Sequence, residues 1–444
     1  MILLMETTLP FSYEYTKVLQ LVSILAHSLL YFYLFWVTGS ALYSFYLEFI
    51  KRDDASTFFA KKLIELSFKK LSFPFVLGLI PFVVIYSLDL IWLRGEEFKP
   101  IHTWSLVALI LFGISIFILY YYKFSFDLIT LLPKSVIDKE TSDYVKLMEN
   151  NLKNHRRSAL IGTIGVLITI FLISILSVAK LDYNQNGNRF DLIAYFFQLD
   201  VNFRFLFYLV LSFSVTFFMS LFFNLVWEDS RLDETEGMSK FIEEKSLRGV
   251  FVTILLQPLL ILIDVLILPE SSLSYWIFLS SGISIILLFL IINQLNAYQK
   301  EFLKSYISYS FYMLIFVIIF ISIKDVVAFA NVLKPKSVEI AKNFLTYEEN
   351  LKTKLNIKTV TINAEEIFTA KCSACHQFDQ KLVGPPYNDV LKKYENNKDQ
   401  LVKFILNPVK IDPAYPPMPA QGLIPPEAEA VADYLMKVYK EGKQ

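Results

Sequence analysis

Eight stretches of apolar residues recur along the chain, and each is long enough to cross a bilayer as an α-helix. A spanning helix needs about 20 residues with few charges. The stretches cover residues 18–47, 71–93, 103–122, 158–179, 203–227, 248–268, 273–296 and 305–330. The pattern therefore predicts an all-α fold in which residues 1–330 form an integral membrane domain of eight helices.

The pattern changes after the eighth stretch, where polar and apolar residues become mixed. Residues 331–361 are charged and predict a linker with a short helix near 337–353. Residues 362–444 then alternate short amphipathic segments with loops, and the last segment, about 426–440, has an apolar helical face. We therefore expect a small separate domain of residues 362–444 after the membrane bundle.

Basic residues in the connections between the apolar stretches predict the orientation of the chain. The loops after stretches one, three, five and seven hold nineteen Lys and Arg. The loops on the opposite side hold five: Arg94, Lys99, Lys180, Arg189 and Arg204. Cytoplasmic loops carry the excess of Lys and Arg. We expect both termini outside the cytoplasm, which places residues 362–444 on the periplasmic side of the inner membrane. Because the start lacks a basic region followed by a short apolar core, no cleaved signal peptide is expected.

Composition supports a membrane protein and excludes two other classes. The chain is 55% hydrophobic and only 19% charged, and its formal net charge is zero, so nothing favours nucleic-acid binding. There are two cysteines in the whole chain. Their spacing of three residues excludes a structural disulfide framework.

Those two cysteines lie in the sequence Cys372-Ser373-Ala374-Cys375-His376. Thiols at i and i+3 face one side of a helical turn and can both bond to the vinyl groups of a haem, while the next residue, His376, lies under the iron. A zinc site would need further Cys or His nearby, and residues 362–444 contain none. The motif predicts one covalently attached haem c.

Around this motif, residues 362–444 resemble the class I mono-haem cytochromes c. Gly384 and Pro385 stand where that family has a Gly-Pro pair. The resemblance implies that the carbonyl of Pro385 accepts a hydrogen bond from the proximal histidine and orients its ring. It also implies that Phe368, before the first cysteine, packs against the last helix, with Tyr434 as its partner.

The iron needs a second axial ligand, and this domain offers two methionines and no second histidine. Met418 lies in the proline-rich sequence 415–419, the kind of loop that holds the axial methionine of the family. Met436 lies inside the last predicted helix, where a core position is expected. We therefore expect His376 and Met418 to hold the iron, which favours single-electron transfer over oxygen binding.

Ionisable residues within apolar stretches mark functional sites by default, and three of them stand out. His27, Asp89 and Asp264 all fall in the outer half of the predicted bilayer. They suit a quinol site or a b-type haem. For a second haem ligand, His102 lies on the same side as His27 but differs from it in depth by about 10 Å, and His155 falls in a cytoplasmic loop. The alternatives are that His27 is hydrogen-bonded between helices and that the two aspartates reach water at the interface.

The first two stretches also resemble the start of the large subunit of bd-type quinol oxidases. His27 matches a haem-ligating histidine of the first helix, and residues 75–78 match a Phe-x-Leu-Gly sequence of the second. The third stretch lacks the expected Glu, and the Gly-Arg-Gln-Pro-Trp signature is absent. Oxygen reduction by this chain alone is therefore not expected, although a related role as a subunit stays open.

Together these patterns predict a membrane-anchored c-type cytochrome that relays electrons in a respiratory chain, as a subunit of a larger complex surrounded by lipid. The expected partners are a quinol-oxidising donor and a periplasmic acceptor or terminal oxidase. The alternatives are a quinol:cytochrome c oxidoreductase, a bd-oxidase-like subunit, or a bundle that only anchors the cytochrome. Lysines of the last domain are candidates for docking an acidic partner: Lys371, Lys381, Lys392, Lys393, Lys398, Lys403 and Lys410.

Overall fold

The chain divides into two compact units, residues 1–342 and 343–444. The computed structural model describes residues 12–93, 98–131, 142–186, 190–227, 236–354, 363–395 and 397–441. Every regular element in these ranges is a helix or a helical turn, and none is a strand. The predicted all-α fold class is therefore confirmed.

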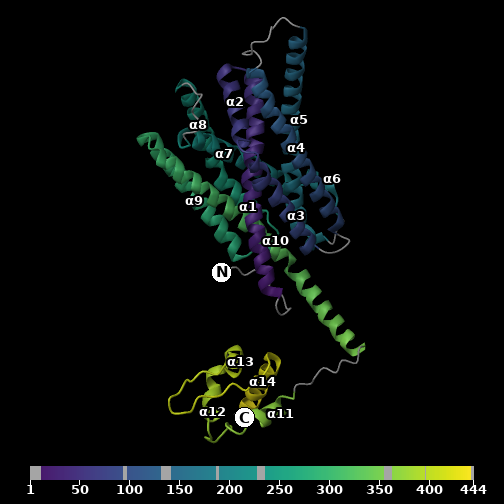
Figure 1. The fold of residues 1–444 in the computed structure, drawn as a ribbon, viewed down its shortest axis with the longest axis vertical. Coiled ribbons are helices and arrows are strands. Elements are labelled where there is room, and N and C mark those ends of the chain that lie inside the picture. Colours follow the sequence, from purple (N-terminus) through teal and green to yellow (C-terminus); the bar gives the residue numbers. More distant parts are fainter. Residues whose placement is uncertain are drawn as a thin grey trace. The chain divides into compact units, whose positions relative to one another are not determined.

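Eight helices in the described ranges are long and apolar enough to cross a membrane, as predicted. Figure 1 shows them as one bundle. They are α1 (Ser12–Phe45) with the π-helical turn η1 (Tyr46–Lys51), η2 (Pro74–Leu79) with α3 (Ile80–Trp92), α4 (Lys99–Leu131), α5 (Ser142–Asn186), α7 (Leu199–Leu225), α8 (Glu236–Leu266), α9 (Tyr275–Glu301) and α10 (Lys304–Lys354).

Three shorter elements connect the spanning helices: α2 (Asp54–Ser67), α6 (Leu192–Phe197) and the turn η6 (Glu270–Ser272). Asp53 begins α2 because its carboxylate accepts a hydrogen bond from the backbone N–H of Ser56 at 2.8 Å. Asp191 does the same for α6. Side chains of this kind satisfy backbone donors that a helix leaves unpaired at its start.

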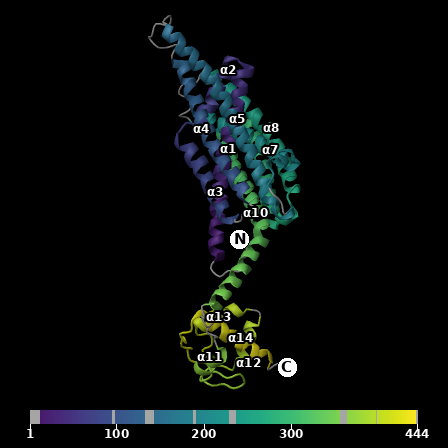
Figure 2. The same cartoon turned by 90° about the vertical axis from the view of Figure 1, so that its right-hand side faces the viewer.

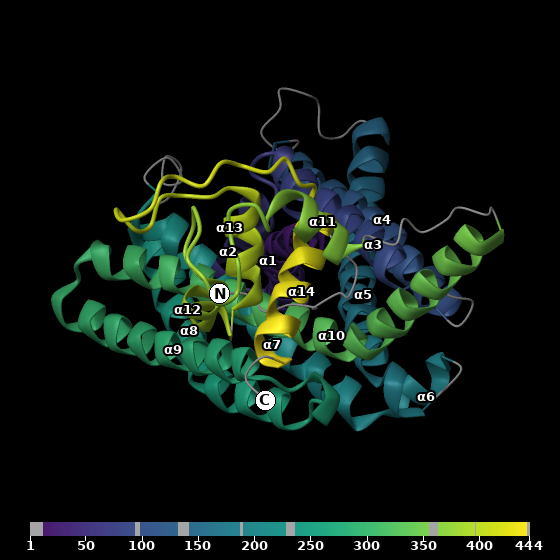
Figure 3. The same ribbon diagram turned by 90° about the horizontal axis from the view of Figure 1, so that it is seen from below.

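Figure 3 shows helix α1 near the middle of the bundle. It contacts α7, α2, α3 and α5. The approach of α1 to α7 is close because Gly39 lacks a side chain. A Cβ at this position would lie 2.3 Å from the carbonyl oxygen of Ser212. Small residues allow such contacts between spanning helices. Helices α4 and α5 run side by side over much of their length, as seen in Figure 2.

Large apolar side chains point outward from the bundle, including Phe117, Ile164, Leu255 and Phe289. Exposed apolar surface of this extent marks contact with another apolar phase. With the eight spanning helices, it identifies a multi-pass membrane protein.

Several helices extend beyond the apolar stretches that predicted them. Helix α5 begins at Ser142, so His155 lies inside a helix and not in a loop. Lys180 and Arg204 also lie in helices, α5 and α7, although the sequence assigns them to outer loops. Helix α10 continues without a break to Lys354, so the short helix predicted near 337–353 is part of it.

The second unit holds α11 (Ala364–Lys371), α12 (Tyr387–Val390), the turn η7 (Leu391–Tyr394), α13 (Lys398–Leu406) and α14 (Pro425–Glu441). Helices α11 and α14 pack against each other. At their contact the rings of Phe368 and Tyr434 lie 5.4 Å apart, as predicted. Leu391, Leu401, Val431 and Leu435 form the apolar core beside this contact.

Candidate functional site

The end of α11 positions the two thiols of the second unit. The chain leaves α11 in a tight turn, in which the N–H groups of Cys375 and His376 donate to the carbonyl of Cys372 at 3.1 and 3.0 Å. This turn brings both cysteines and His376 to the wall of one cavity of about 210 Å³. The local turn therefore gathers the groups that the sequence motif assigns to haem attachment.

His376 is held in a single orientation by its neighbours. Its Nδ1–H donates to the carbonyl oxygen of Pro385 at 3.0 Å, which is the contact implied by the family resemblance. Because a carbonyl only accepts, the proton is on Nδ1 and the lone pair of Nε2 is free to bind a metal. The ring of Tyr387 stacks on His376 with centroids 5.0 Å apart.

Gly384 allows the chain to pass directly against the His376 ring. A Cβ on Gly384 would lie 2.1 Å from Cε1 of His376 and 2.6 Å from its Nδ1. No side chain fits at that distance, so only glycine leaves the ring in its place. The glycine of the Gly-Pro pair is thus a packing requirement of the proximal histidine.

We expect Gly384→Ala to displace the His376 ring and to destabilise the second unit by about 1–3 kcal/mol, as overpacking does. The thermal midpoint and the midpoint potential of the purified protein measure both effects. Gly282→Ala is the control, because a Cβ on Gly282 meets no atom within 4 Å. If Gly384→Ala behaves like this control, the packing argument is wrong.

The two methionines of this unit have different surroundings. Met418 lies in the loop between α13 and α14 and lines the cavity with Pro416, Pro417 and Pro419. Met436 is buried in the core on α14 and is not among the lining residues. Met418, and not Met436, therefore lies on the cavity wall, and its role as an axial ligand stays a prediction.

The chemistry of the cavity wall fits a haem. Its lining is largely aliphatic and aromatic, with both thiols and His376 in one place. Burial raises the pKa of the Cys372 thiol and of the Tyr387 hydroxyl, so both carry protons at neutral pH. Three of the seven lysines predicted to dock a partner, Lys371, Lys393 and Lys410, also line this cavity.

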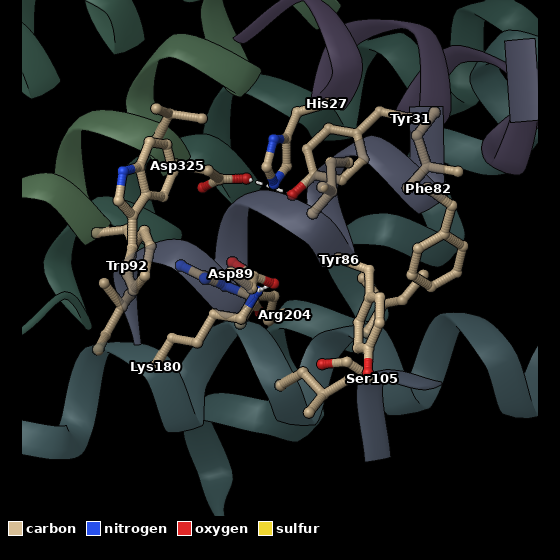
Figure 4. Close-up of a pocket in the computed structure, with 18 residues that line it drawn as sticks. His27, Tyr31, Phe82, Tyr86, Asp89, Trp92, Ser105, Lys180, Arg204 and Asp325 are labelled. Atoms are coloured by element: carbon tan, nitrogen blue, oxygen red, sulfur yellow. Dashed lines mark hydrogen bonds and ion pairs between the residues drawn. The ribbon is translucent and has the colours of Figure 1, made fainter. Parts of the chain in front are cut away.

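A second cavity, of about 70 Å³, lies among the spanning helices of the first unit. Figure 4 shows its lining, with His27 pointing into it from α1 and Asp89 on α3. Two of the three membrane residues singled out in the sequence therefore meet at one site. The hydroxyl of Tyr31 donates to Asp325 at 3.0 Å at the same site. The remaining polar lining residues are Tyr86, Ser105, Ser177, Lys180 and Arg204.

The third predicted residue, Asp264, lies outside this cavity and is 1% exposed. Its carboxylate accepts from Nε of Arg204 at 3.1 Å and from Nζ of Lys324. Lys324 is 2.9 Å from the carboxylate of Asp325. Asp264 is therefore part of a buried ion-pair network and does not reach water at the membrane interface.

Asp89 is also buried, at 4% exposure, and its carboxylate lies 2.5 Å from Nζ of Lys180. The interfacial interpretation is thus wrong for both aspartates. Lys180 and Arg204 could not be recognised as part of this site from the sequence, because both count there among the basic residues of the outer loops. It also missed Lys324 and Asp325, although two adjacent charges inside an apolar stretch are a signal that could have been used.

The two histidines considered for a b-type haem have different surroundings in the described part of the chain. His102 lies on α4, where its Nε2 contacts the carbonyl oxygen of Leu93 at 2.8 Å. The described lining of the membrane cavity includes His27 and excludes His102. The geometry therefore gives no bis-histidine iron site at this position.

A separate buried cluster lies at the other end of α1, around Glu48 in η1. Its carboxylate contacts Nε2 of His155 at 2.5 Å and accepts a hydrogen bond from the hydroxyl of Tyr122. Nδ1 of His155 lies 2.6 Å from Oγ of Ser125. These contacts connect η1, α4 and α5, and no pattern in the sequence predicts them.

Comparisons with known proteins bear on the second unit. Residues 362–438 match the cytochrome c family. This part of the chain is 40% identical over 77 residues to cytochrome c-551 from Pseudomonas denitrificans, an alignment that covers 16% of this chain and 93% of that protein. It is 33% identical over 84 residues to cytochrome c-552 from Hydrogenobacter thermophilus, covering 18% of this chain and 85% of that protein. No solved structure matches the chain.

These relatives are matched over most of their length, and the match includes the cavity with its two thiols and its histidine. The domain therefore has haem c as its cofactor and electron transfer as its function. Through residues 362–438, the chain belongs to the cytochrome c family.

Proposed function

We propose that this protein is a membrane-anchored c-type cytochrome that relays single electrons in a respiratory chain, as a subunit of a larger membrane complex. The observation that carries this proposal is a cavity lined by Cys372, Cys375, His376 and Met418 on a chain with eight spanning helices. The bound haem would supply an iron that changes its charge by one. The thiols would fix the ring, and His376 and Met418 would occupy both axial positions.

A haem whose iron has protein ligands at both axial positions is suited to electron transfer and not to oxygen binding. If His376 and Met418 both held the iron, no coordination position would be left for a small molecule. A purified chain should therefore show one c-type haem in its pyridine haemochrome spectrum and no carbon monoxide shift after reduction. A carbon monoxide-sensitive spectrum would contradict the assignment of both ligands.

The midpoint potential of the haem tests directly whether Met418 is an axial ligand. We expect Met418→Ala to keep the haem attached but to lower its midpoint potential, because a thioether ligand raises the potential. A fall on the order of 100 mV is well within the ~0.8 V over which axial ligands tune haems. Met436→Leu is the control and should leave the potential unchanged. An unchanged potential in Met418→Ala would remove this residue from the iron.

The proposed location is the inner membrane, with both termini and the cytochrome domain on the periplasmic side. The support is the excess of Lys and Arg in alternate loops. Trypsin added to intact spheroplasts should release a haem-stained fragment, whereas inside-out vesicles should protect it. Protection in spheroplasts would reverse the orientation.

The proposed partners are a quinol-oxidising donor and a periplasmic acceptor or terminal oxidase. Lys371, Lys393 and Lys410 on the cavity wall support docking to an acidic surface, since charge complementarity raises association rates. Electron transfer to such a partner should then slow as ionic strength rises. For complex membership, native electrophoresis of detergent-solubilised membranes should place the haem stain well above the 51.6 kDa of the chain.

A further inference from the structure

We propose that the cavity beside His27 binds a hydroquinone and oxidises it, so that the membrane bundle itself supplies electrons to the haem. This inference rests on the proposed function, because the haem is the electron acceptor. At about 70 Å³ the cavity has room for several water molecules, and the ring of a hydroquinone would enter it by moving lining side chains. Six spanning helices contribute residues to the cavity lining, and its apolar wall includes Phe82, Ile85, Trp92, Ile173, Leu176 and Phe329.

The charges around the cavity select a neutral ligand. The carboxylate of Asp89 pairs with Lys180, and that of Asp325 pairs with Lys324. Arg204 on the cavity wall is likewise paired with Asp264 behind it. These three pairs cancel, so the site has no excess charge to attract an ion. A ligand from the lipid phase that is neutral and can form hydrogen bonds at its ends fits this lining.

The tautomer of His27 makes it a base that faces this ligand. Its Nδ1 lies 2.8 Å from the carbonyl oxygen of Ser23. A carbonyl only accepts, so the proton of the neutral ring is on Nδ1 and Nε2 carries the lone pair. Figure 4 shows the ring directed into the cavity, next to the Tyr31–Asp325 bond.

A second polar group in the cavity lacks a partner. Oγ of Ser105 on α4 is buried and forms no hydrogen bond among the described residues. A buried hydroxyl without a partner is costly, and a ligand in this cavity would satisfy it. Ser105 and His27 come from different helices and both line the cavity. A ring with two hydroxyl groups can meet both.

The reaction balances with the groups present. Oxidation of a hydroquinone to the quinone breaks two O–H bonds and releases two protons and two electrons. One proton passes to Nε2 of His27, and the second leaves toward the carboxylate of Asp89. Because the c haem takes one electron at a time, each hydroquinone reduces it twice, with reoxidation by the periplasmic acceptor between the two steps.

The test is stopped-flow reduction of the haem in the purified full-length protein by decylubiquinol. We expect His27→Ala to slow this reduction about a hundredfold, within the 10²–10⁴ that a positioned base contributes. Ser105→Leu would fill the cavity without removing a charge and should raise the KM for decylubiquinol several-fold. His102→Ala is the matched control: another histidine, outside the cavity lining, whose loss should leave the rate unchanged.

A separate portion of each protein is mixed with ascorbate in place of decylubiquinol, because ascorbate reduces the haem without the membrane site. Normal reduction by ascorbate with no reduction of the wild type by decylubiquinol would overturn this inference and leave the proposed function standing. Equal decylubiquinol rates in wild type, His27→Ala and Ser105→Leu would overturn it as well. So would a b-type haem spectrum that disappears in His27→Ala, since His27 would then hold iron. A protein that carries no haem would instead remove the proposed function.

Discussion

Replacing both cysteines, in a Cys372→Ser and Cys375→Ser double variant, is expected to abolish covalent haem attachment completely. The two thiols lie on one turn after α11, where each can bond one vinyl group. Serine has nearly the same size but forms no thioether. The measurement is haem staining of the membrane fraction after denaturing electrophoresis, in which only covalently bound haem stays with the chain.

Each single variant should keep a weaker stain, because one thioether bond is left. Ser373→Ala is the control in the same turn, where the hydroxyl only donates to the carbonyl of Thr369 at 2.6 Å. Full staining of the double variant would show that haem is held elsewhere. The prediction concerns attachment alone and therefore does not depend on the role of Met418.

Asp264→Ala is expected to destabilise the membrane bundle by about 3–5 kcal/mol. The substitution leaves the buried cations of Arg204 and Lys324 without the carboxylate that joins them, and breaking a buried ion pair costs about this much. Thermal unfolding of the detergent-solubilised protein, followed by circular dichroism, measures the change. Glu270→Ala, which removes an exposed carboxylate from η6, is the control.

The thermal stability of Asp264→Asn should lie between those of Asp264→Ala and the wild type. The amide keeps the volume of the side chain and one hydrogen-bond acceptor but loses the charge. If Asp264→Ala unfolded at the same temperature as the wild type, the ion-pair network would make no net contribution to stability. Replacing a whole ion-pair network by apolar residues can indeed be neutral. Asp264→Ala is therefore chosen because it removes one carboxylate and leaves both cations buried.

The haem site could be predicted from the sequence because its parts are close together along the chain. The two thiols and His376 share one turn, and the domain offers a single plausible methionine. The role of Gly384 could be inferred only as part of a family pattern. The physical reason for the glycine is that a Cβ on Gly384 would lie 2.1 Å from the His376 ring. Only the three-dimensional structure reveals this contact. A spacing in sequence does not report such a distance.

The spanning helices were also predictable, since hydropathy alone decides which segments enter a bilayer. Their ends were not, because apolar windows stop at the first charges. Lys180 was assigned to a loop for this reason, yet its partner Asp89 is 91 residues away on α3. An ion pair between helices neutralises both charges and lets each remain buried. The sequence records the two charges but not their pairing.

The ion-pair network around Asp264 also has a consequence for how the protein is made. Arg204, Asp264 and Lys324 belong to α7, α8 and α10, which leave the ribosome in that order. An unpaired charge costs about 2.5–3.5 kcal/mol at the centre of a single inserted helix, and less near the helix ends, where Arg204 and Asp264 lie. The aspartate can meet the arginine once α8 is inserted, but the lysine and Asp325 enter only with α10. Biogenesis of the bundle is therefore completed by its last spanning helix, and a chain truncated before α10 should be recognised by membrane quality control as unfinished.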